Sequence, residues 1–153
     1  MSRPSWDQIW ISFAKNISQR SCDPRHKVGA VIVTEDNTQV LGVGYNGDYA
    51  GGPNEVESLE PGESGTIHAE INALVKMNFS HHKRKTMYVT LSPCRACAKA
   101  IINGGIDKLI YLDLYRDQSS ISLLLEAGIS VTQHEEPGRV PDEGFTPLFK
   151  PRP

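Results

Sequence analysis

The sequence has little cysteine, no long apolar run and no marked excess of charge of either sign. Its three cysteines are an odd count, and Cys94 and Cys97 have the C-x-x-C spacing of metal ligands, so we expect reduced thiols and no disulfide scaffold. No stretch approaches the ~18 apolar residues that a membrane-spanning helix needs. Met1 to Trp6 also lacks the apolar core of a secretory signal. These absences predict a cytoplasmic protein without a membrane partner.

The charge and the length narrow the class of protein further. A nucleic-acid polymer favours a basic surface, and the formal net charge is −2, so we expect no such partner. The 153 residues suit one compact domain and contain no internal repeat, so residues 1–153 are predicted to form a single domain. Five of the ten prolines lie in the last 17 residues, which predicts an irregular proline-rich tail over about 137–153, draped on the surface or used in assembly.

Hydrophobic periodicity predicts alternating helices and strands. A capping box of Ser5 and Gln8 begins a first helix over about 5–19. Its apolar residues recur at helical spacing and should pack on a sheet: Trp6, Ile9, Trp10, Phe13 and Ile17. The second half of the chain alternates strand and helix, which predicts parallel strands joined by right-handed crossovers.

The other predicted elements follow from β-branched runs, caps and turn residues. Strands are expected at 28–33, 40–45, 87–91, 109–112 and 129–133. One helix should span 67–79, with Thr66 as its cap and Ile71, Leu74, Val75 and Phe79 on its buried side. Another should span 93–103, with Ser92 as its cap and Pro93 in its first position, and a third 118–127. The loop over 46–65 is long enough to be functional.

His68, Cys94 and Cys97 have the residue types of a zinc site. Two cysteines three residues apart at a helix start share one face, where the helix dipole favours thiolates. Three protein ligands leave the fourth position of tetrahedral zinc to water, and Glu70 is placed to move the protons of that water. H-x-E followed by P-C-x-x-C, here with 25 residues between His68 and Cys94, is the signature of zinc-dependent base deaminases. We predict one catalytic zinc per chain.

A closed structural zinc site is the alternative, and it needs a fourth protein ligand. The candidates are the remaining cysteine and histidines: Cys22, His26, His81, His82 and His134. No second C-x-x-C and no paired histidine motif completes such a module. The basic stretch 81–85 is predicted to be a solvated loop, with phosphate or partner contact as the alternative.

Longer segments around these motifs extend the match over about residues 20–133. They are Asp23-Pro24, Lys27-Val28-Gly29-Ala30, Gly44-Tyr45-Asn46-Gly47, His68-Ala69-Glu70-Ile71-Asn72-Ala73, Tyr88-Val89-Thr90-Leu91-Ser92-Pro93-Cys94 and Cys97-Ala98-Lys99. Together they resemble the deoxycytidylate (dCMP) deaminases, most of all the phage and viral members. The resemblance implies an α/β, cytidine-deaminase-like three-layer fold with a five-stranded mixed sheet flanked by helices.

The resemblance also implies an activity and the residues that perform it. The reaction is hydrolysis of dCMP to dUMP and ammonia at the C–N bond of a cyclic amidine, which feeds dTTP synthesis, in the host cytoplasm if the chain is phage-encoded. His68, Cys94 and Cys97 would hold zinc, and Glu70 would be the acid and base. Substrate contacts would come from the Asn46 side chain, the Ala69 N–H, the Ser92 carbonyl and the walls Val28 and Tyr115. A substrate phosphate needs a cation, from among Arg25, Lys27, Arg95 and Arg116.

Regulation and assembly are implied in the same way. Family members are commonly homohexamers, activated by dCTP and inhibited by dTTP together with Mg²⁺. The corresponding effector residues would be Arg25, Lys27, Asn46, Gly47 and Asp48. The 46–67 segment contains no cysteine, so a second, structural zinc is not expected there.

Three other functions stay open on the sequence. The enzyme could act on free deoxycytidine or cytidine, or on both nucleoside and nucleotide. A tRNA adenosine deaminase shares the metal motif, although a large RNA partner favours a basic domain. A zinc-stabilised interaction module without catalysis is the third, and release of ammonia from dCMP separates it from the enzymes.

Overall fold

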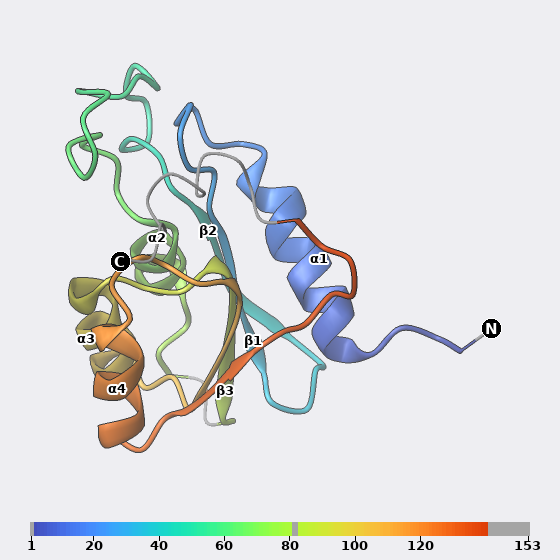
Figure 1. The fold of residues 1–153 in the computed structure, drawn as a ribbon. Coiled ribbons are helices and arrows are strands. Elements are labelled where there is room, and N and C mark those ends of the chain that lie inside the picture. Colours follow the sequence, from blue (N-terminus) through green and yellow to red (C-terminus); the bar gives the residue numbers. More distant parts are fainter. Residues whose placement is uncertain (1, 81–82, 141–153) are drawn as a thin grey trace.

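A five-stranded mixed sheet lies at the centre of the computed structural model, which describes residues 2–80 and 83–140 (Figure 1). The strand order is β2-β1-β3-β4-β5. β1 pairs antiparallel with both β2 and β3, whereas β3, β4 and β5 run parallel. The predicted mixed sheet with a parallel half is confirmed. The bounds are β1 (Gly29–Thr34), β2 (Val40–Tyr45), β3 (Lys85–Leu91), β4 (Lys108–Asp113) and β5 (Ser130–Gln133).

Helices cover both faces of this sheet and complete three layers (Figure 1). α1 (Trp6–Ser18) covers one face, and α2 (Ala69–Lys76), α3 (Arg95–Asn103) and α4 (Ser119–Glu126) cover the other. The predicted three-layer α/β fold is therefore confirmed. No helix within the described ranges is long and apolar enough to span a membrane. His81, His82 and residues 141–153 of the predicted tail lie outside the described residues.

The core is divided into two parts by the sheet. All six residues of β1 are buried, as expected for a strand covered on both faces. Ile32, Met87 and Leu109 belong to the part under α2, α3 and α4. Val31 and Ile110 belong to the part under α1. Side chains of β3 enter both parts of the core, Met87 on one face and Tyr88 on the other. Cys94 follows this strand, at the start of α3.

Only part of the apolar stripe predicted for α1 packs on the sheet. Trp10 packs against the core on this face, but Trp6, Ile9 and Phe13 are exposed, and for these three the prediction is wrong. The exposed fractions of Trp6, Ile9 and Phe13 are 55%, 41% and 37%, and the fully buried residues are Ile11 and Ala14. The cause lies in β1, because a Cβ on Gly29 would lie 1.9 Å from the Ala14 carbonyl oxygen. At so close an approach only the small-residue face of α1 fits.

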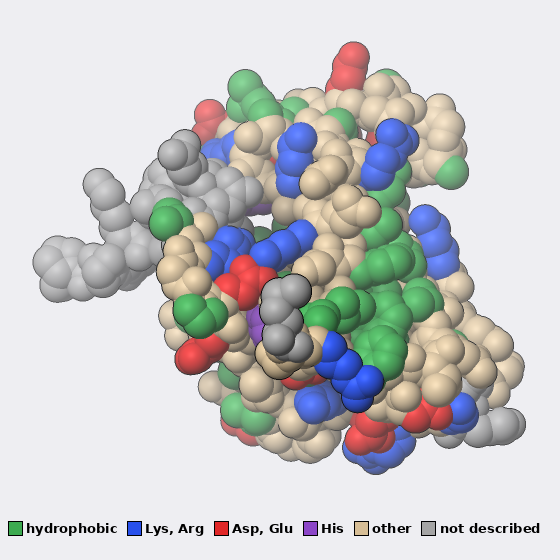
Figure 2. Space-filling view, turned by 90° about the vertical axis from the view of Figure 1, so that its right-hand side faces the viewer, with side chains coloured by type: hydrophobic (Ala, Val, Ile, Leu, Met, Phe, Trp, Pro, Cys, Tyr) green, Lys and Arg blue, Asp and Glu red, His purple; other side chains and the backbone are tan. Residues whose placement is uncertain are grey.

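The displaced aromatic residues pack on one another instead. The Trp6 and Trp10 rings stack with centroids 5.8 Å apart, and Phe13 meets Trp10 edge-on. Figure 2 faces the α1 side of the molecule and shows hydrophobic side chains gathered in a band at the surface. We call Trp6, Ile9 and Phe13 the α1 band.

Close backbone contact also seats α2, the helix that follows His68. A Cβ on Gly44 would lie 2.3 Å from the Ala69 carbonyl oxygen, and one on Gly42 would lie 2.6 Å from that of Ala73. These distances are far below any real Cβ contact, so β2 needs glycine at both positions. The glycines therefore fix the height of α2 above the sheet.

Gly44→Ala should lower the free energy of unfolding by ~1–3 kcal/mol, the usual effect of overpacking a close contact. Chemical denaturation measures the change. The matched control is Gly47→Ala, where the added Cβ would meet only the Tyr45 ring, at 3.0 Å. Equal losses in the two variants would contradict the proposed role of the α2–β2 contact.

Candidate metal centre and active-site cavity

His68, Cys94 and Cys97 come together at the starts of two helices. Their ligand atoms all lie within 4.8 Å of one another. His68 Nδ1 is 3.2 Å from Cys97 Sγ and 3.6 Å from Cys94 Sγ. The donor set of one imidazole and two thiols suits zinc. This group could hold a metal ion, as the sequence predicted.

Two predicted helix caps are wrong, and both errors concern metal-site residues. α2 begins after His68 rather than at Thr66, and α3 begins after Cys94 rather than at Ser92. Cys94 Sγ accepts a hydrogen bond from the Cys97 N–H at 3.5 Å. Two of the three candidate ligands, His68 and Cys94, therefore occupy cap positions, and the unpaired N–H groups at the start of α3 favour a thiolate at Cys94. The shorter α2 ends at Lys76. Val75 within it and Phe79 beyond it are exposed, so the burial predicted for these two residues is wrong.

A fourth protein ligand is absent from the cluster within residues 2–80 and 83–140. Among those residues, Cys22, His26 and His134 lie outside the group that could hold a metal, and the other two candidates lie outside the described residues. This arrangement favours an open metal position over a closed structural site.

Glu70 lies beside the three candidate ligands. His68 has extended backbone angles (φ −65°, ψ 151°) and Glu70 is in the first turn of α2, so two residues that would diverge on a helix both line one cavity. Only 4% of Glu70 is exposed. Burial raises the pKa of its carboxyl to about 7, against the opposing effect of a backbone hydrogen bond. A carboxyl with a pKa near neutrality suits both proton uptake and proton release.

The three candidate ligands also perturb one another. The hydrogen bond from Cys97 is the main reason that the pKa of the Cys94 thiol falls to about 4, and the same contact raises the pKa of Cys97. The hydrogen bond to Cys94 raises the pKa of His68. Perturbed groups gathered in a cavity are typical of functional sites.

The cavity beside this group has a volume of about 110 Å³. All five predicted substrate contacts line it: Val28, Asn46, Ala69, Ser92 and Tyr115. Of the predicted effector residues, Arg25 and Asn46 line this cavity, while Lys27, Gly47 and Asp48 do not. The predicted effector residues therefore do not all face the same cavity.

Asn46 is already engaged in positioning the wall of the cavity. Its Oδ1 accepts the Val28 N–H at 2.8 Å, and its Nδ2 donates to the His26 carbonyl at 2.7 Å. Each amide atom keeps a second hydrogen-bonding position. Asn46 can therefore hold the 26–28 segment and meet a ligand at the same time.

Ser92 and Tyr115, which both line the cavity, are joined by a hydrogen bond that the sequence did not indicate. The Ser92 hydroxyl accepts the Tyr115 N–H at 2.6 Å. The Arg116 guanidinium lies over the Tyr115 ring, 5.6 Å from its centroid. Ser92 therefore does not cap α3. Its hydroxyl instead holds the backbone of Tyr115.

Sequence reasoning missed several lining residues. The carboxylate of Asp23 is buried and accepts the N–H groups of Arg25 and His26. Asp23 lies in one of the segments that resemble the dCMP deaminases, but the sequence alone indicated no role for it. The 58–66 stretch of the predicted long loop forms another wall, held by a 3.0 Å hydrogen bond from Arg25 Nη1 to the Leu59 carbonyl. Loop contacts of this kind have no sequence periodicity.

Comparison with known proteins assigns the family. A family model described as "Cytidine and deoxycytidylate deaminase zinc-binding region" matches residues 4–113. The chain belongs to this family. The predicted relationship to the cytidine and deoxycytidylate deaminases is therefore confirmed.

The relatives include phage and animal proteins at similar identity. A deoxycytidylate deaminase of Mycobacterium phage D29 is 37% identical over 126 residues, which are 72% of this chain and 97% of that protein. The human deoxycytidylate deaminase is 37% identical over 121 residues, 73% of this chain and 67% of that protein. The crystal structure of the cyanophage S-TIM5 dCMP deaminase with dCMP and dUMP matches with a TM-score of 0.76 and 33% identity, covering 88% of this chain and all of that one.

Cys22→Ser should retain about one zinc per chain, because Cys22 lies outside the candidate ligand group. Cys97→Ser is the matched cysteine variant and should lose the metal. Elemental analysis of the purified proteins measures both. Loss of zinc from the Cys22 variant would favour a closed site instead.

Proposed function

We propose that this chain is a zinc-dependent dCMP deaminase that hydrolyses dCMP to dUMP and ammonia and so feeds dTTP synthesis. The observation that carries the proposal is a buried carboxyl, Glu70, beside a three-residue metal group in a cavity. The similar cyanophage enzyme, crystallised with dCMP and dUMP, supports the choice of substrate.

Zinc, when bound, acts as a Lewis acid toward a water molecule at its open position. His68, Cys94 and Cys97 would hold it, one ion per chain. Glu70 takes a proton from the attacking water and delivers it to the pyrimidine N3. It then takes the second proton, from the new hydroxyl on C4, and delivers it to the amine, which leaves as ammonia. Its pKa of about 7 lets it gain and lose a proton near neutral pH.

The other lining residues orient the nucleotide. Val28 and Tyr115 both line the cavity and would pack on the base. The Ala69 N–H would meet the pyrimidine O2, and the Ser92 carbonyl would meet the amino group. Asn46 would reach the sugar with the hydrogen-bonding positions that the 26–28 segment leaves free.

The cavity lining supports two of the four candidate phosphate cations. Arg25 and Arg116 line the cavity, whereas Lys27 and Arg95 do not. A guanidinium suits a phosphate because it donates two parallel hydrogen bonds. We therefore assign the substrate phosphate to Arg25 and Arg116, with Arg116 the less restrained because no hydrogen bond to the described residues holds it.

Glu70→Gln should lower kcat for dCMP by at least ~100-fold, because general acid–base catalysis contributes ~100- to 10,000-fold. The amide keeps the size of the side chain, so the variant should still bind about one zinc. Steady-state ammonia release and elemental analysis test the two parts. Near-normal kcat with zinc bound would refute the role of Glu70.

Arg116→Gln should raise KM for dCMP by ~10-fold or more, the loss of one charge-assisted hydrogen bond, and leave KM for deoxycytidine nearly unchanged. Arg95→Gln is the control, since Arg95 begins α3 outside the cavity. A native enzyme with higher kcat/KM for deoxycytidine than for dCMP would instead favour the nucleoside deaminase alternative.

Regulation by dCTP as activator and by dTTP with Mg²⁺ as inhibitor belongs to the same proposal. One contact supports a route to the metal site: Gly47 and Ile67 exchange backbone hydrogen bonds of 3.1 and 2.8 Å, directly before His68. An effector at Gly47 and Asp48 would therefore act on a candidate ligand. Assays with both nucleotides test this part.

Homohexamer formation and cytoplasmic location complete the proposal. The exposed α1 band supports self-association, because exposed apolar patches commonly mark interaction sites. Analytical ultracentrifugation tests the assembly.

A further inference from the structure

A second cavity lies behind the wall of the active-site cavity. Its volume is about 340 Å³, and it is lined by α1, by the carboxyl ends of β3 and β4, and by the segment that follows β5. His26 and Leu91 line both cavities. None of the candidate metal ligands lines the second one, and neither does Glu70. A ligand bound there would lie beside the catalytic site and outside it.

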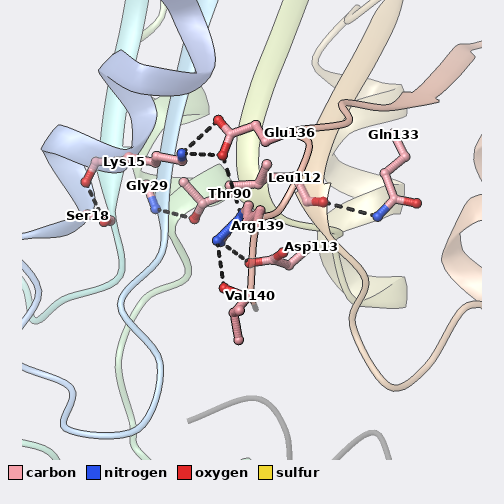
Figure 3. A network of polar contacts seen from close by, with 10 residues as sticks. All are labelled: Lys15, Ser18, Gly29, Thr90, Leu112, Asp113, Gln133, Glu136, Arg139 and Val140. Atoms are coloured by element: carbon pink, nitrogen blue, oxygen red, sulfur yellow. Dashed lines mark hydrogen bonds and ion pairs between the residues drawn. The ribbon is translucent and has the colours of Figure 1, made fainter. Parts of the chain in front are cut away.

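Positive charge is in excess around this second cavity. Lys15 Nζ lies 2.7 and 2.6 Å from the two carboxylate oxygens of Glu136, and Arg139 pairs with Asp113 (Figure 3). Lys27 is exposed and forms no hydrogen bond or ion pair with the other described residues. Three cations, Lys15, Lys27 and Arg139, thus accompany two carboxylates, Asp113 and Glu136.

The guanidinium of Arg139 has an unused donor. Its Nη1 donates to the Val140 carbonyl at 3.2 Å and its Nη2 to Asp113 (Figure 3). Its Nε is buried and has no hydrogen-bond acceptor within the described part of the chain. Glu136 Oε2 lies 3.8 Å away, beyond hydrogen-bonding distance. Such a buried N–H calls for an acceptor.

Thr90 adds a second donor to the same cavity. Its Oγ1 accepts the Gly29 N–H at 3.1 Å (Figure 3), so its own hydroxyl proton remains to be donated. The cavity therefore offers an ammonium, a guanidinium N–H and a hydroxyl. A phosphate group carries several acceptor oxygens and negative charge, which matches this set.

A purely structural role explains only part of this arrangement. The contacts of Lys15 and Arg139 do tie the segment after β5 to α1 and β4 (Figure 3). They leave Lys27 without a partner among the described residues, however, and they do not fill the volume. The volume of about 340 Å³ is also within the range of ligand pockets, which start at ~300 Å³.

We propose that this second cavity binds a phosphate-bearing small molecule, with Lys27 and Arg139 as its cationic contacts. The ligand would contact His26, which also lines the active-site cavity. The His26 carbonyl accepts the hydrogen bond from Asn46. It is therefore placed to affect the active-site cavity without entering it. The binding itself does not depend on the proposed deaminase activity.

Calorimetric titration of inorganic phosphate into the full-length zinc protein tests the proposal. The Arg116→Gln variant serves as background, because it weakens phosphate binding in the active-site cavity. In that background phosphate should still bind, and adding Lys27→Gln should raise Kd by ~10-fold or more. Lys27 is exposed and unpaired among the described residues, so its replacement should not disturb folding. Adding Lys99→Gln, an exposed lysine of α3, should change nothing.

Backbone NMR locates the bound phosphate independently. Amide shifts on titration should appear at residues 26–29 and 139–140, and should disappear with Lys27→Gln. Shifts confined to 58–66 and 116, or a Kd that Lys27→Gln leaves unchanged, would overturn the proposal. No phosphate binding in the Arg116→Gln background would overturn it as well.

Discussion

The close approach of α2 to β2 is the contact on which the rest of the site depends. Gly42 and Gly44 leave room for the helix backbone, and this sets the position of His68 at its start. Cys94 is positioned separately, by the end of β3 and the short turn through Ser92. Because β1 pairs with both β2 and β3, the sheet fixes the distance between the two helix starts. Hydrogen-bonded strands thus fix the positions of the two helix starts that carry the candidate metal ligands.

The 26–28 segment has a similar positioning role on the opposite side of the cavity. Asn46 holds it by two side-chain hydrogen bonds, and the Asn46 N–H donates to the Val28 carbonyl at 3.2 Å. Three hydrogen bonds from one residue make this wall a rigid unit. His26 in this segment lines both cavities, so a change on one side of the segment is in contact with the other. His26 is therefore important for its position, because it forms part of the wall of both cavities.

The sequence predicted the sheet, the helices of the described residues and the group of three residues that could hold a metal, because each depends on local pattern or on residue type. β-branched runs fall where strands are found, and Cys94, Cys97 and His68 fall where the motif requires them. The errors arose where tertiary contacts decide. Periodicity identified an apolar stripe on α1, but Gly29 in β1 selects the face with Ala14. Propensity chose Ser92 and Thr66 as caps, whereas the site places a cysteine and a histidine there.

Several features could not be predicted because they join distant residues. The bond from Arg25 to the Leu59 carbonyl and that from Ser92 to Tyr115 depend on loop conformations that leave no periodic signal. The second cavity is a similar case, since Lys15 and Arg139 are brought together only by the path of the chain after β5. Charge counts along the sequence show a nearly neutral protein. Only the fold shows that cations collect around one cavity.

Glu70 shows how function departs from the rules that stabilise the fold. A buried carboxyl is normally paired with a cation or saturated by hydrogen bonds, yet burial dominates the environment of Glu70 and raises its pKa. A better-paired carboxylate would favour the folded state, but a firmly ionised group could not deliver protons near neutral pH. His68 is likewise a helix start without a side-chain cap. Both departures lie at one point of the molecule, and the rest of the sheet and its cores must stabilise the fold around them.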